Sequence, residues 1–273
     1  MSSQPWTLYE LITASIARSL RDGDVGFTGL TTGGPAATFA TVAPLVAMEL
    51  ARRTHAPNLT ILLAGWSHNP NLSKLSFVPN SEFAPALREL ECDAQMIDYP
   101  GQWSVKRGDV DVGFSSGAQV DVQGNLNAVC IGDYHRPKVR LVGPIFQPEH
   151  LALFRREIIM MPHHDRRNFV QKVDFVSGVG YPGGLEGRKA LGLEWGGPEL
   201  VMTPKCIFDF DKERGRMRVK SIHPGVTPEE VRQNTGFDLG NLSGLPVTEE
   251  PTEDQLRIIR EEIDPRGILL PRG

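Results

Sequence analysis

The hydrophobic pattern of the first quarter of the chain alternates between the helix and strand periods. Apolar side chains within Leu8–Leu20 recur at the 3.6-residue spacing of an amphipathic helix. A strand from Val25, a helix over Ala37–Arg53 and a strand over Leu59–Ala64 are expected next. The last of these is a continuous apolar run, which is typical of a strand buried on both faces of a parallel sheet. This order of helices and strands predicts an α/β protein.

Short apolar runs separated by Gly, Asn and Pro follow in the middle of the chain. Four of them fit core strands of about five residues, namely Val110–Phe114, Ala118–Val122, Glu157–Met161 and Val173–Val176. Residues 181–198 are too rich in glycine and proline for a regular element, so a long surface loop or linker is expected there.

The C-terminal part predicts a hairpin and two helices. Leu200–Phe210 and Met217–Ile222 flank a charged turn, as the two arms of a hairpin do. A short helix over Pro228–Asn234 begins with the capping-box pattern, and a final helix is expected over Glu253–Ile263. Because the sequence contains no internal repeat or composition break, we expect one α/β domain over residues 1–273.

Composition narrows the classes of function. The 273 residues carry 29 basic and 33 acidic side chains, a formal charge of −4, which argues against nonspecific nucleic-acid binding. The chain has no uninterrupted apolar stretch of membrane-spanning length and begins without the pattern of a secretory signal. We therefore expect a soluble, cytoplasmic protein that binds neither nucleic acid nor membrane.

The three cysteines, Cys92, Cys130 and Cys206, are widely spaced and form no C-x-x-C pair. Neither a disulfide framework nor a structural zinc site is indicated, so buried thiols are expected. The adjacent His163 and His164 do not predict a metal site either, because neighbours in a strand point to opposite faces. No metal ligands are therefore assigned.

Glycine-rich segments are candidates for binding an anion. They are Gly29–Gly34, Gly113–Gly117, and Gly124 with Gly132, and none of them matches a Walker loop or a G-x-G-x-x-G fingerprint. Glycines after strands either make turns or let backbone N–H groups approach a phosphate or a developing oxyanion. Both interpretations stay open at this point.

Two polar segments are candidates for chemistry. Gly132–Arg140 concentrates basic side chains in an acidic chain, which indicates either a solvated basic edge or a pocket for a phosphorylated ligand. Ser67 and His68 follow an expected strand. They either form a polar turn, or His68 is an acid/base group at the mouth of a cleft. The nucleophile motif G-x-S-x-G is absent.

A long motif carries a family resemblance. Gly113–Asn127 reads G-F-S-S-G-A-Q-V-D-V-Q-G-N-L-N, and Ile131–Lys138 reads I-G-D-Y-H-R-P-K. In both, the chain resembles the B (beta) subunits of heteromeric class I CoA-transferases, of which the glutaconate and 3-oxoadipate enzymes are examples. The resemblance extends through Val176–Tyr181 and Ser221–Val226 to Arg260–Pro265. It implies an open, mostly parallel α/β sheet with flanking helices, the CoA-transferase fold.

The resemblance also implies partners and substrates. Enzymes of this type work with a separate A (alpha) subunit, commonly as an A2B2 heterotetramer. They act on an acyl-CoA thioester, so coenzyme A enters as part of the substrate and no bound cofactor is implied.

Two departures from the family change the expected reaction. The transferases use a Glu as nucleophile, and Ala64 stands at that position here, with no Asp or Glu between Ala56 and Ser81 to replace it. A methyl group cannot attack a thioester. The glycine-rich loop of the family reads Val142–Gln147 here and keeps only Gly143, which indicates a reshaped acyl pocket.

Relatives that have lost the Glu resemble a steroid ring-opening CoA hydrolase and a glutaconyl-type CoA decarboxylase, both of which break a C–C bond. We favour C–C hydrolysis. Decarboxylation, true CoA transfer with a carboxylate from elsewhere, and a noncatalytic structural subunit remain alternatives.

The resemblance assigns the candidate site as follows. Contacts with the thioester and CoA are expected from Gly117, Ala118, Gln119, Asp133, Tyr134, His135 and Gly143. His68 is the candidate acid/base or orienting residue, because it lies four positions beyond Ala64. Arg136 and Lys138 are candidates for contact with phosphates.

Overall fold

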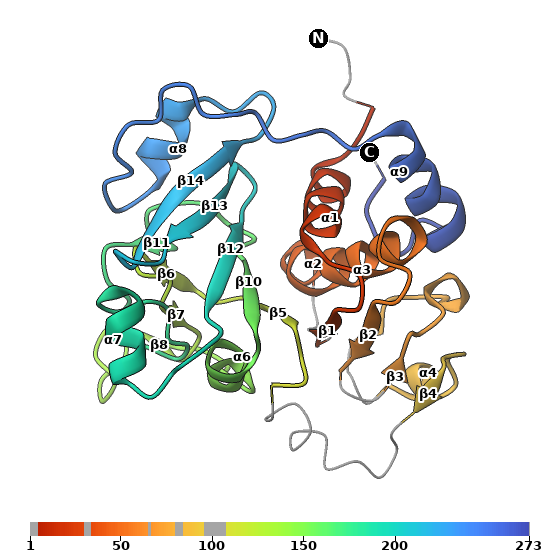
Figure 1. The fold of residues 1–273 in the computed structure, drawn as a ribbon, viewed down its shortest axis with the longest axis horizontal. Coiled ribbons are helices and arrows are strands. Elements are labelled where there is room, and N and C mark those ends of the chain that lie inside the picture. The colour runs from red at the N-terminus through yellow and green to blue at the C-terminus, as the bar shows by residue number, and fades with distance from the viewer. Residues whose placement is uncertain (1–4, 30–33, 65–66, 80–83, 96–107, 273) are drawn as a thin grey trace. The chain divides into compact units, whose positions relative to one another are not determined.

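The computed structural model describes residues 5–29, 34–64, 67–79, 84–95 and 108–272. The chain divides into two compact units, one of Met1–Phe114 with Glu249–Gly273 and one of Ser115–Thr248 (Figure 1). The single domain expected from the sequence stays a prediction.

The first unit has a parallel centre and antiparallel additions. Strand β1 (Val25–Thr28) pairs in parallel with β2 (Thr60–Leu63) and with β5 (Val112–Ser115), of which Ser115 opens the second unit. Two short strands, β3 (Ser67–His68) and β4 (Ala94–Gln95), then continue the sheet antiparallel beyond β2. Three of the strands expected from apolar runs, at Val25, Leu59–Ala64 and Val110–Phe114, are thereby confirmed.

Helices flank this sheet. They are α1 (Leu8–Ser19), the continuous run α2 (Gly34–Ala37), η1 (Thr38–Val42) and α3 (Ala43–Thr54), the short η2 (Leu72–Lys74) and α4 (Pro85–Arg88), and the C-terminal pair α9 (Glu253–Arg257) and η3 (Ile258–Ile263). A capping box at Thr7 and Glu10 starts α1. Glu10 also pairs with Arg260 of η3 at 2.6 Å, which ties the two ends of the chain together. The helices expected at Leu8–Leu20, Ala37–Arg53 and Glu253–Ile263 are confirmed.

The run Gly34–Thr54 is long and apolar enough to cross a membrane by length and composition, yet 72% of the tested stretch is buried inside the fold. It packs tightly on the sheet, since a methyl group added at Gly26 of β1 would overlap the Met48 side chain. Both observations identify it as a core helix of a folded protein.

The second unit contains three sheets. Strand β10 (Arg156–Met160) pairs in parallel with β12 (Pro198–Met202), which continues antiparallel into β13 (Cys206–Asp211) and β14 (Arg216–Ile222). A three-stranded sheet has the order β11 (Phe169–Val170), β6 (Gln119–Asp121), β7 (Leu126–Asn127), and β8 (Cys130–Ile131) forms a hairpin with β9 (Val139–Arg140). The helices are α6 (Gln147–Leu153), α7 (Gly184–Ala190) and α8 (Pro228–Asn234). The predicted hairpin is confirmed by the antiparallel pair of β13 and β14, and the predicted helix over Pro228–Asn234 is confirmed by α8.

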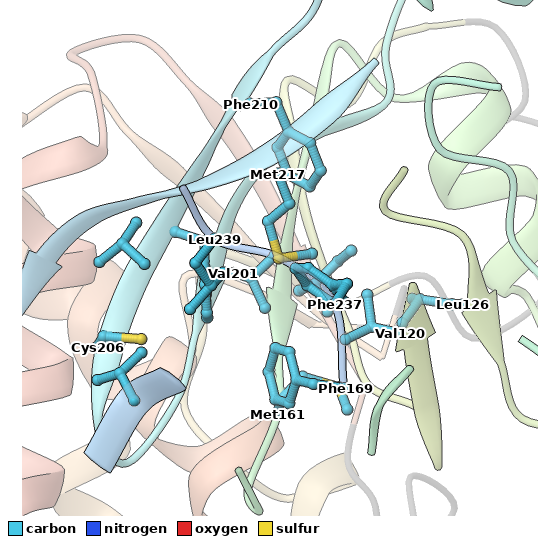
Figure 2. Packing of buried hydrophobic residues seen from close by; sticks show 14 of the residues in the cluster. Val120, Leu126, Met161, Phe169, Val201, Cys206, Phe210, Met217, Phe237 and Leu239 are labelled. Atoms are coloured by element: carbon cyan, nitrogen blue, oxygen red, sulfur yellow. The ribbon is translucent and has the colours of Figure 1, made fainter. Parts of the chain in front are cut away.

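Side chains from several of these strands share one hydrophobic core (Figure 2). Val120 and Phe169 come from the three-stranded sheet, and Val201 and Phe210 come from β12 and β13. Phe237, from the loop after α8, also belongs to this cluster. This core fixes the small sheet, which carries the long motif, against β12–β14.

Three sequence expectations are wrong in this unit. Val173–Val176 is not a strand, because Val173 N and Asp174 N donate to side chains instead of a neighbouring strand. The expected loop 181–198 contains α7, and the run Leu200–Phe210 is divided between β12 and β13.

The glycines near α7 serve close packing. Gly184 has a left-handed φ of 73°, and a methyl group at Gly187 would overlap the carbonyl of Pro182. The glycines of this segment therefore belong to a tightly packed helix and to the residues that precede it, and not to an open loop. The expected α/β class with a large, mostly parallel sheet and flanking helices is confirmed, with antiparallel strands added to the parallel pairs.

Candidate functional site

The long motif builds a compact polar scaffold around Asp121. This carboxylate is only 2% exposed and accepts hydrogen bonds from the backbone of Gln123 and from the backbone and side chain of Asn125, each at 3.0 Å. Burial raises the pKa of Asp121, while these hydrogen bonds and one from Val173 oppose the rise. Asp121 therefore closes the tight turn between β6 and β7.

The turn is locked to a second motif segment. Asn125 Oδ1 accepts from the backbone N–H of Gly180 at 2.9 Å. A methyl group at Gly180 would overlap the carbonyl of Gln123, so only glycine allows this approach. Segments 55 positions apart in the chain thus lie in contact.

Gln119 and Asn127 form a second layer of hydrogen bonds. Asn127 Nδ2 donates to Gln119 Oε1 at 2.8 Å and to the Cys130 carbonyl at 2.7 Å. Gln119 Nε2 donates to Asp174 Oδ2 at 3.2 Å, and the backbone N–H of Gly132 donates to the same oxygen at 2.9 Å. The Gln119 side chain therefore acts inside the scaffold and links it to the start of the β8–β9 hairpin.

Gly117 and Ala118 lie at the half-buried edge of this scaffold. A Cβ atom at Gly117 would approach the Asn127 carbonyl oxygen to 3.0 Å, which is tighter than most real contacts. The Ala118 N–H donates to Asn127 O at 2.8 Å, and the Ala118 carbonyl accepts from Asn168 Nδ2 at 2.8 Å. The accessible stretch Ser116–Ala118 is thus held by its backbone between two buried strands.

The segment that follows is exposed. Asp133 Oδ1 accepts from the backbone of His135 at 2.9 Å and of Arg136 at 3.0 Å and so shapes the turn. Tyr134, 47% exposed, stacks on Phe175 with ring centroids 5.2 Å apart. Residues 133–135 are thereby linked through Gly132 and Asp174 to Gln119, so the structure brings these candidate residues together.

Gly143 has a φ of 99°, and a Cβ atom there would meet nothing within 4 Å. Its neighbours Val142 and Ile145 are 95% and 82% exposed. Ile145 adopts a left-handed φ of 48°, which is a strained conformation for a β-branched residue. An open, apolar and strained loop stands where the resemblance places a glycine-rich one.

His68 lies in the first unit, whereas the other candidate contacts lie in the second. It is half-buried in β3, opposite Leu62 of β2, and its buried Nε2 has no hydrogen-bond partner among the described residues. Ala64, at the end of β2, has a left-handed φ of 53° and donates its N–H to the Thr28 carbonyl at 2.8 Å. The Gly29–Gly34 loop falls largely outside the described residues, as do Gly65 and Trp66.

Sequence reasoning missed a buried cluster of Ser115, His150 and Glu157. Glu157 is fully buried, and its Oε1 accepts from Ser115 Oγ and from His150 Nδ1, the latter at 3.2 Å. Ser115 and Glu157 both approach Nδ1 of the imidazole, so the histidine does not relay a proton between opposite ring nitrogens as in a hydrolase triad. No spacing in the sequence signals this cluster, since its members are 7 to 42 positions apart.

Two other buried histidines are structural. His164 bonds Thr203 Oγ1 at 3.0 Å and Thr235 Oγ1 at 3.1 Å, one on each ring nitrogen. Burial lowers the pKa of His164 to about 3 and that of His223 to about 4. Both rings are therefore neutral hydrogen-bonding groups. Of the three cysteines, Cys130 and Cys206 are buried as expected, whereas Cys92 is half-buried.

Comparisons with known proteins agree with this geometry. Residues 94–234 match the family described as Coenzyme A transferase. The chain is 32% identical over 262 residues to the B (beta) chain of glutaconate CoA-transferase from Acidaminococcus fermentans, covering 95% of this chain and 93% of the relative. It is 34% identical over 255 residues to the B (beta) chain of 3-oxoadipate CoA-transferase from Pseudomonas knackmussii, covering 92% and 91%.

A third relative carries a different name. The cholesterol ring-cleaving hydrolase IpdB subunit of Rhodococcus jostii is 33% identical over 150 residues, covering 55% of this chain and 58% of the relative.

Among solved structures, the A. fermentans glutaconate CoA-transferase matches with a TM-score of 0.79 and 30% identity, covering 98% of this chain and 99% of the other. R. jostii IpdAB matches with a TM-score of 0.75 and 26% identity, covering 97% and 98%. The family model and the full-length relatives converge with the motif and its scaffold: the chain belongs to the coenzyme A transferase family and is of the beta type.

Proposed function

We propose that this chain is the beta subunit of a cytoplasmic two-subunit enzyme that hydrolyses a C–C bond in an acyl-CoA. The observation that carries the proposal is Ala64 at the end of β2, where the resemblance places the nucleophilic Glu of the transferases. Without a carboxylate between Ala56 and Ser81, this chain has no group there to form the acyl anhydride on which transfer depends.

The proposed reaction needs a polarised thioester and a base, and it needs no covalent enzyme adduct. Water adds to a carbonyl carbon β to the thioester, and the bond between that carbon and the α-carbon breaks. The electron pair of that bond moves toward the thioester oxygen as an enolate, and a proton then returns to the α-carbon. Backbone donors that stabilise the enolate supply the main electrostatic contribution.

The scaffold suggests how the candidates divide this work. Gly117 lets the thioester approach the backbone. Gln119 holds the stretch Ser116–Ala118 in place through its hydrogen bonds to Asn127 and Asp174. The Ala118 peptide is engaged by Asn127 and Asn168, so we assign Ala118 to the wall of the cleft. Asp133, Tyr134 and His135 extend that wall, and Gly143 permits close approach by CoA.

His68 is the proposed acid/base or orienting group. Its ring is half-buried, and its Nε2 has no hydrogen-bond partner among the described residues, so this nitrogen is not already committed to another polar group. Replacing it in a His68→Ala variant is expected to lower turnover at least tenfold without unfolding the complex, and unchanged turnover would remove it from the site.

The partner is proposed from the relatives. IpdAB is by name an assembly of two kinds of chain, and two full-length relatives are named as one kind of subunit of their enzymes. An A-type (alpha) chain, in an A2B2 heterotetramer, is therefore the expected partner. The name of the IpdB relatives also favours ring-opening hydrolysis over transfer.

One experiment tests whether this chain contributes to a catalytic site that it shares with its partner. This chain, its A-type partner and their mixture are each given butanoyl-CoA in D2O, and deuterium at the α-carbon is followed by NMR. The proposal predicts exchange with the mixture only, because C–C hydrolysis shares the enolate with this exchange. Activity of the A-type chain alone indicates that the present chain is noncatalytic, and inactivity of all three contradicts the proposal.

Borohydride treatment after acyl-CoA addition separates transfer from the other reactions. We expect no trapped adduct on the wild-type complex, and a trapped glutamyl adduct there would establish transfer. The Ala64→Glu variant, assembled with the same partner, is the matched control and is expected to gain the adduct. A decarboxylase is distinguished by release of CO2 from a glutaconyl-type CoA ester, which the hydrolase does not catalyse.

A further inference from the structure

The buried cluster of Ser115, His150 and Glu157 adjoins Ser116–Ala118, the stretch that the proposed function assigns to the thioester. Ser115 is the last residue of β5 and precedes Ser116–Ala118. Its hydroxyl donates to Glu157 Oε1, and Glu157 extends from β10 with 0% exposure. One end of the accessible stretch is thus tied to a carboxylate that no solvent reaches.

The same carboxylate holds helix α6. His150 Nδ1 donates to Glu157 Oε1 at 3.2 Å, and the His150 ring stacks on Phe154 with centroids 4.3 Å apart. One turn earlier on the same helix face, Gln147 Nε2 donates to the carbonyl of Ser116 at 2.6 Å. Two residues of α6 therefore hold two consecutive residues at the end of β5.

Helix α6 also borders the open loop. The helix begins at Gln147, immediately after the strained and exposed Ile145 and the Phe146 that caps it. Whatever fixes α6 fixes the C-terminal end of the Gly143–Ile145 segment. Ser116–Ala118 and Gly143–Ile145, the two accessible stretches in the proposed acyl site, are thus anchored to one group.

This arrangement is costly for stability alone. A fully buried carboxylate is expensive to desolvate, and Glu157 Oε2 has no hydrogen-bond partner among the described residues. An unsatisfied buried polar atom lowers the free energy of unfolding. Replacement of a buried pair of polar groups, such as Glu157 with His150, by well-packed apolar residues is often neutral or stabilising. Positions that break the packing rules in this way are expected at functional sites.

We propose that Glu157 is a positioning residue for the acyl-CoA site. Through Ser115 and His150 it sets Ser116–Ala118 against α6, so that the thioester meets the backbone donors in one fixed geometry. The inference rests on the proposed function for its catalytic consequence, but the structural coupling stands without it. Glu157 does not touch the substrate.

The test compares two replacements of nearly the same size in the complex with the A-type partner. Glu157→Gln keeps an acceptor oxygen for Ser115 and His150, whereas Glu157→Leu keeps the bulk and removes the acceptor. With butanoyl-CoA in D2O, we expect the Leu variant to lose at least tenfold in kcat for α-carbon exchange with KM changed by less than twofold. The Gln variant is expected to recover to within about threefold of wild type. A purely structural role would lower the amount of folded complex and leave the kcat of the folded fraction unchanged.

A second measurement keeps the inference separate from the proposed function. Amide hydrogen exchange of Ser116–Ala118 is expected to rise at least tenfold in Glu157→Leu and to stay near wild type in Glu157→Gln, whether or not the complex turns over any acyl-CoA. Equal protection in both variants overturns the positioning role. If the wild-type complex catalyses no deuterium exchange at the α-carbon of butanoyl-CoA, the proposed function is overturned instead.

If Glu157→Leu fails to fold, the Ser115→Ala variant tests the positioning role instead. This variant removes one hydroxyl from the end of β5 and leaves Glu157 and His150 in place. We expect a three- to tenfold lower kcat and raised amide exchange at Ser116–Ala118. Wild-type values for both would overturn the inference.

Discussion

The two halves of the long motif differ in how they use their polar residues. In Gln119–Asn127 nearly every polar side chain is buried and bonded to another part of the same scaffold. In the second half, Ile131–Lys138, no residue is buried, and the loop that follows it exposes apolar side chains such as Val142. The contrast shows that one family motif can combine a buried part that holds its shape with an exposed part that is open to a ligand or partner. The two parts should respond to mutation in opposite ways.

The largest expected effect is on the scaffold. Asp121→Ala removes the acceptor for three hydrogen bonds from Gln123 and Asn125 and leaves buried donors unsatisfied. We expect a loss of about 3 kcal/mol in the free energy of unfolding, or roughly 6–10 °C in melting temperature. Thermal unfolding measures it.

The matched control is Asp133→Ala, which also removes a carboxylate that accepts two backbone N–H groups, but from the exposed segment. Its expected change is within about 0.5 kcal/mol. Equal destabilisation by the two variants would show that both halves of the motif are structural.

A second comparison sets two buried histidines, His164 and His223, against the same side chains in the unfolded chain. In the folded chain burial lowers the pKa of His164 to about 3 and that of His223 to about 4, whereas an unfolded histidine titrates near 6.5. Between pH 6.5 and 4 the unfolded state therefore binds more protons, and the free energy of unfolding falls as the pH falls. Each of the two histidines contributes a slope of up to about 1.4 kcal/mol per pH unit.

Denaturant unfolding at pH 6 and pH 5 measures this slope. His223→Gln is expected to remove about half of the contribution of the pair to the slope. A wild-type slope that persists in His223→Gln would contradict the assignment.

A smaller effect is expected on binding. If the basic side chains of the exposed segment meet phosphates, the double variant Arg136→Ala/Lys138→Ala will weaken CoA binding by the complex about tenfold at low salt, and less at high salt. Its melting temperature should stay at the wild-type value. Unchanged affinity would mean that these residues form only a solvated basic edge.

The same contrast explains what the sequence could predict. Helices with strong local signals, such as Leu8–Ser19 with its capping box, and strands with continuous apolar runs, such as Thr60–Leu63, need no tertiary information. Val173–Val176 has an apolar composition, but its backbone donors are taken by Gln119 and Asp121 from a distant strand. A single sequence does not announce such a long-range competition.

The site shows the same limit. The family motif predicted contacts with the substrate from Gly117, Gln119 and Asp133, yet the sequence did not indicate that the Gln119 side chain bonds to Asp174 inside the scaffold. Glu157 read as part of an apolar strand, and its meeting with Ser115 arises from tertiary structure alone.

The smallest effect is expected from relieving strain in the exposed loop. Ile145 is β-branched, 82% exposed and left-handed, so that its side chain gains little from packing and its backbone is unfavourable. Ile145→Gly removes the strain, although it also frees the unfolded chain, so we expect a net stabilisation of at most about 1 kcal/mol in the isolated chain. If Ile145 meets the acyl group or the partner, the same variant will weaken that binding in the complex. A variant that is more stable and less active would show that the strain is kept for function, whereas a variant that is more stable and fully active would show that the enzyme does not use this side chain.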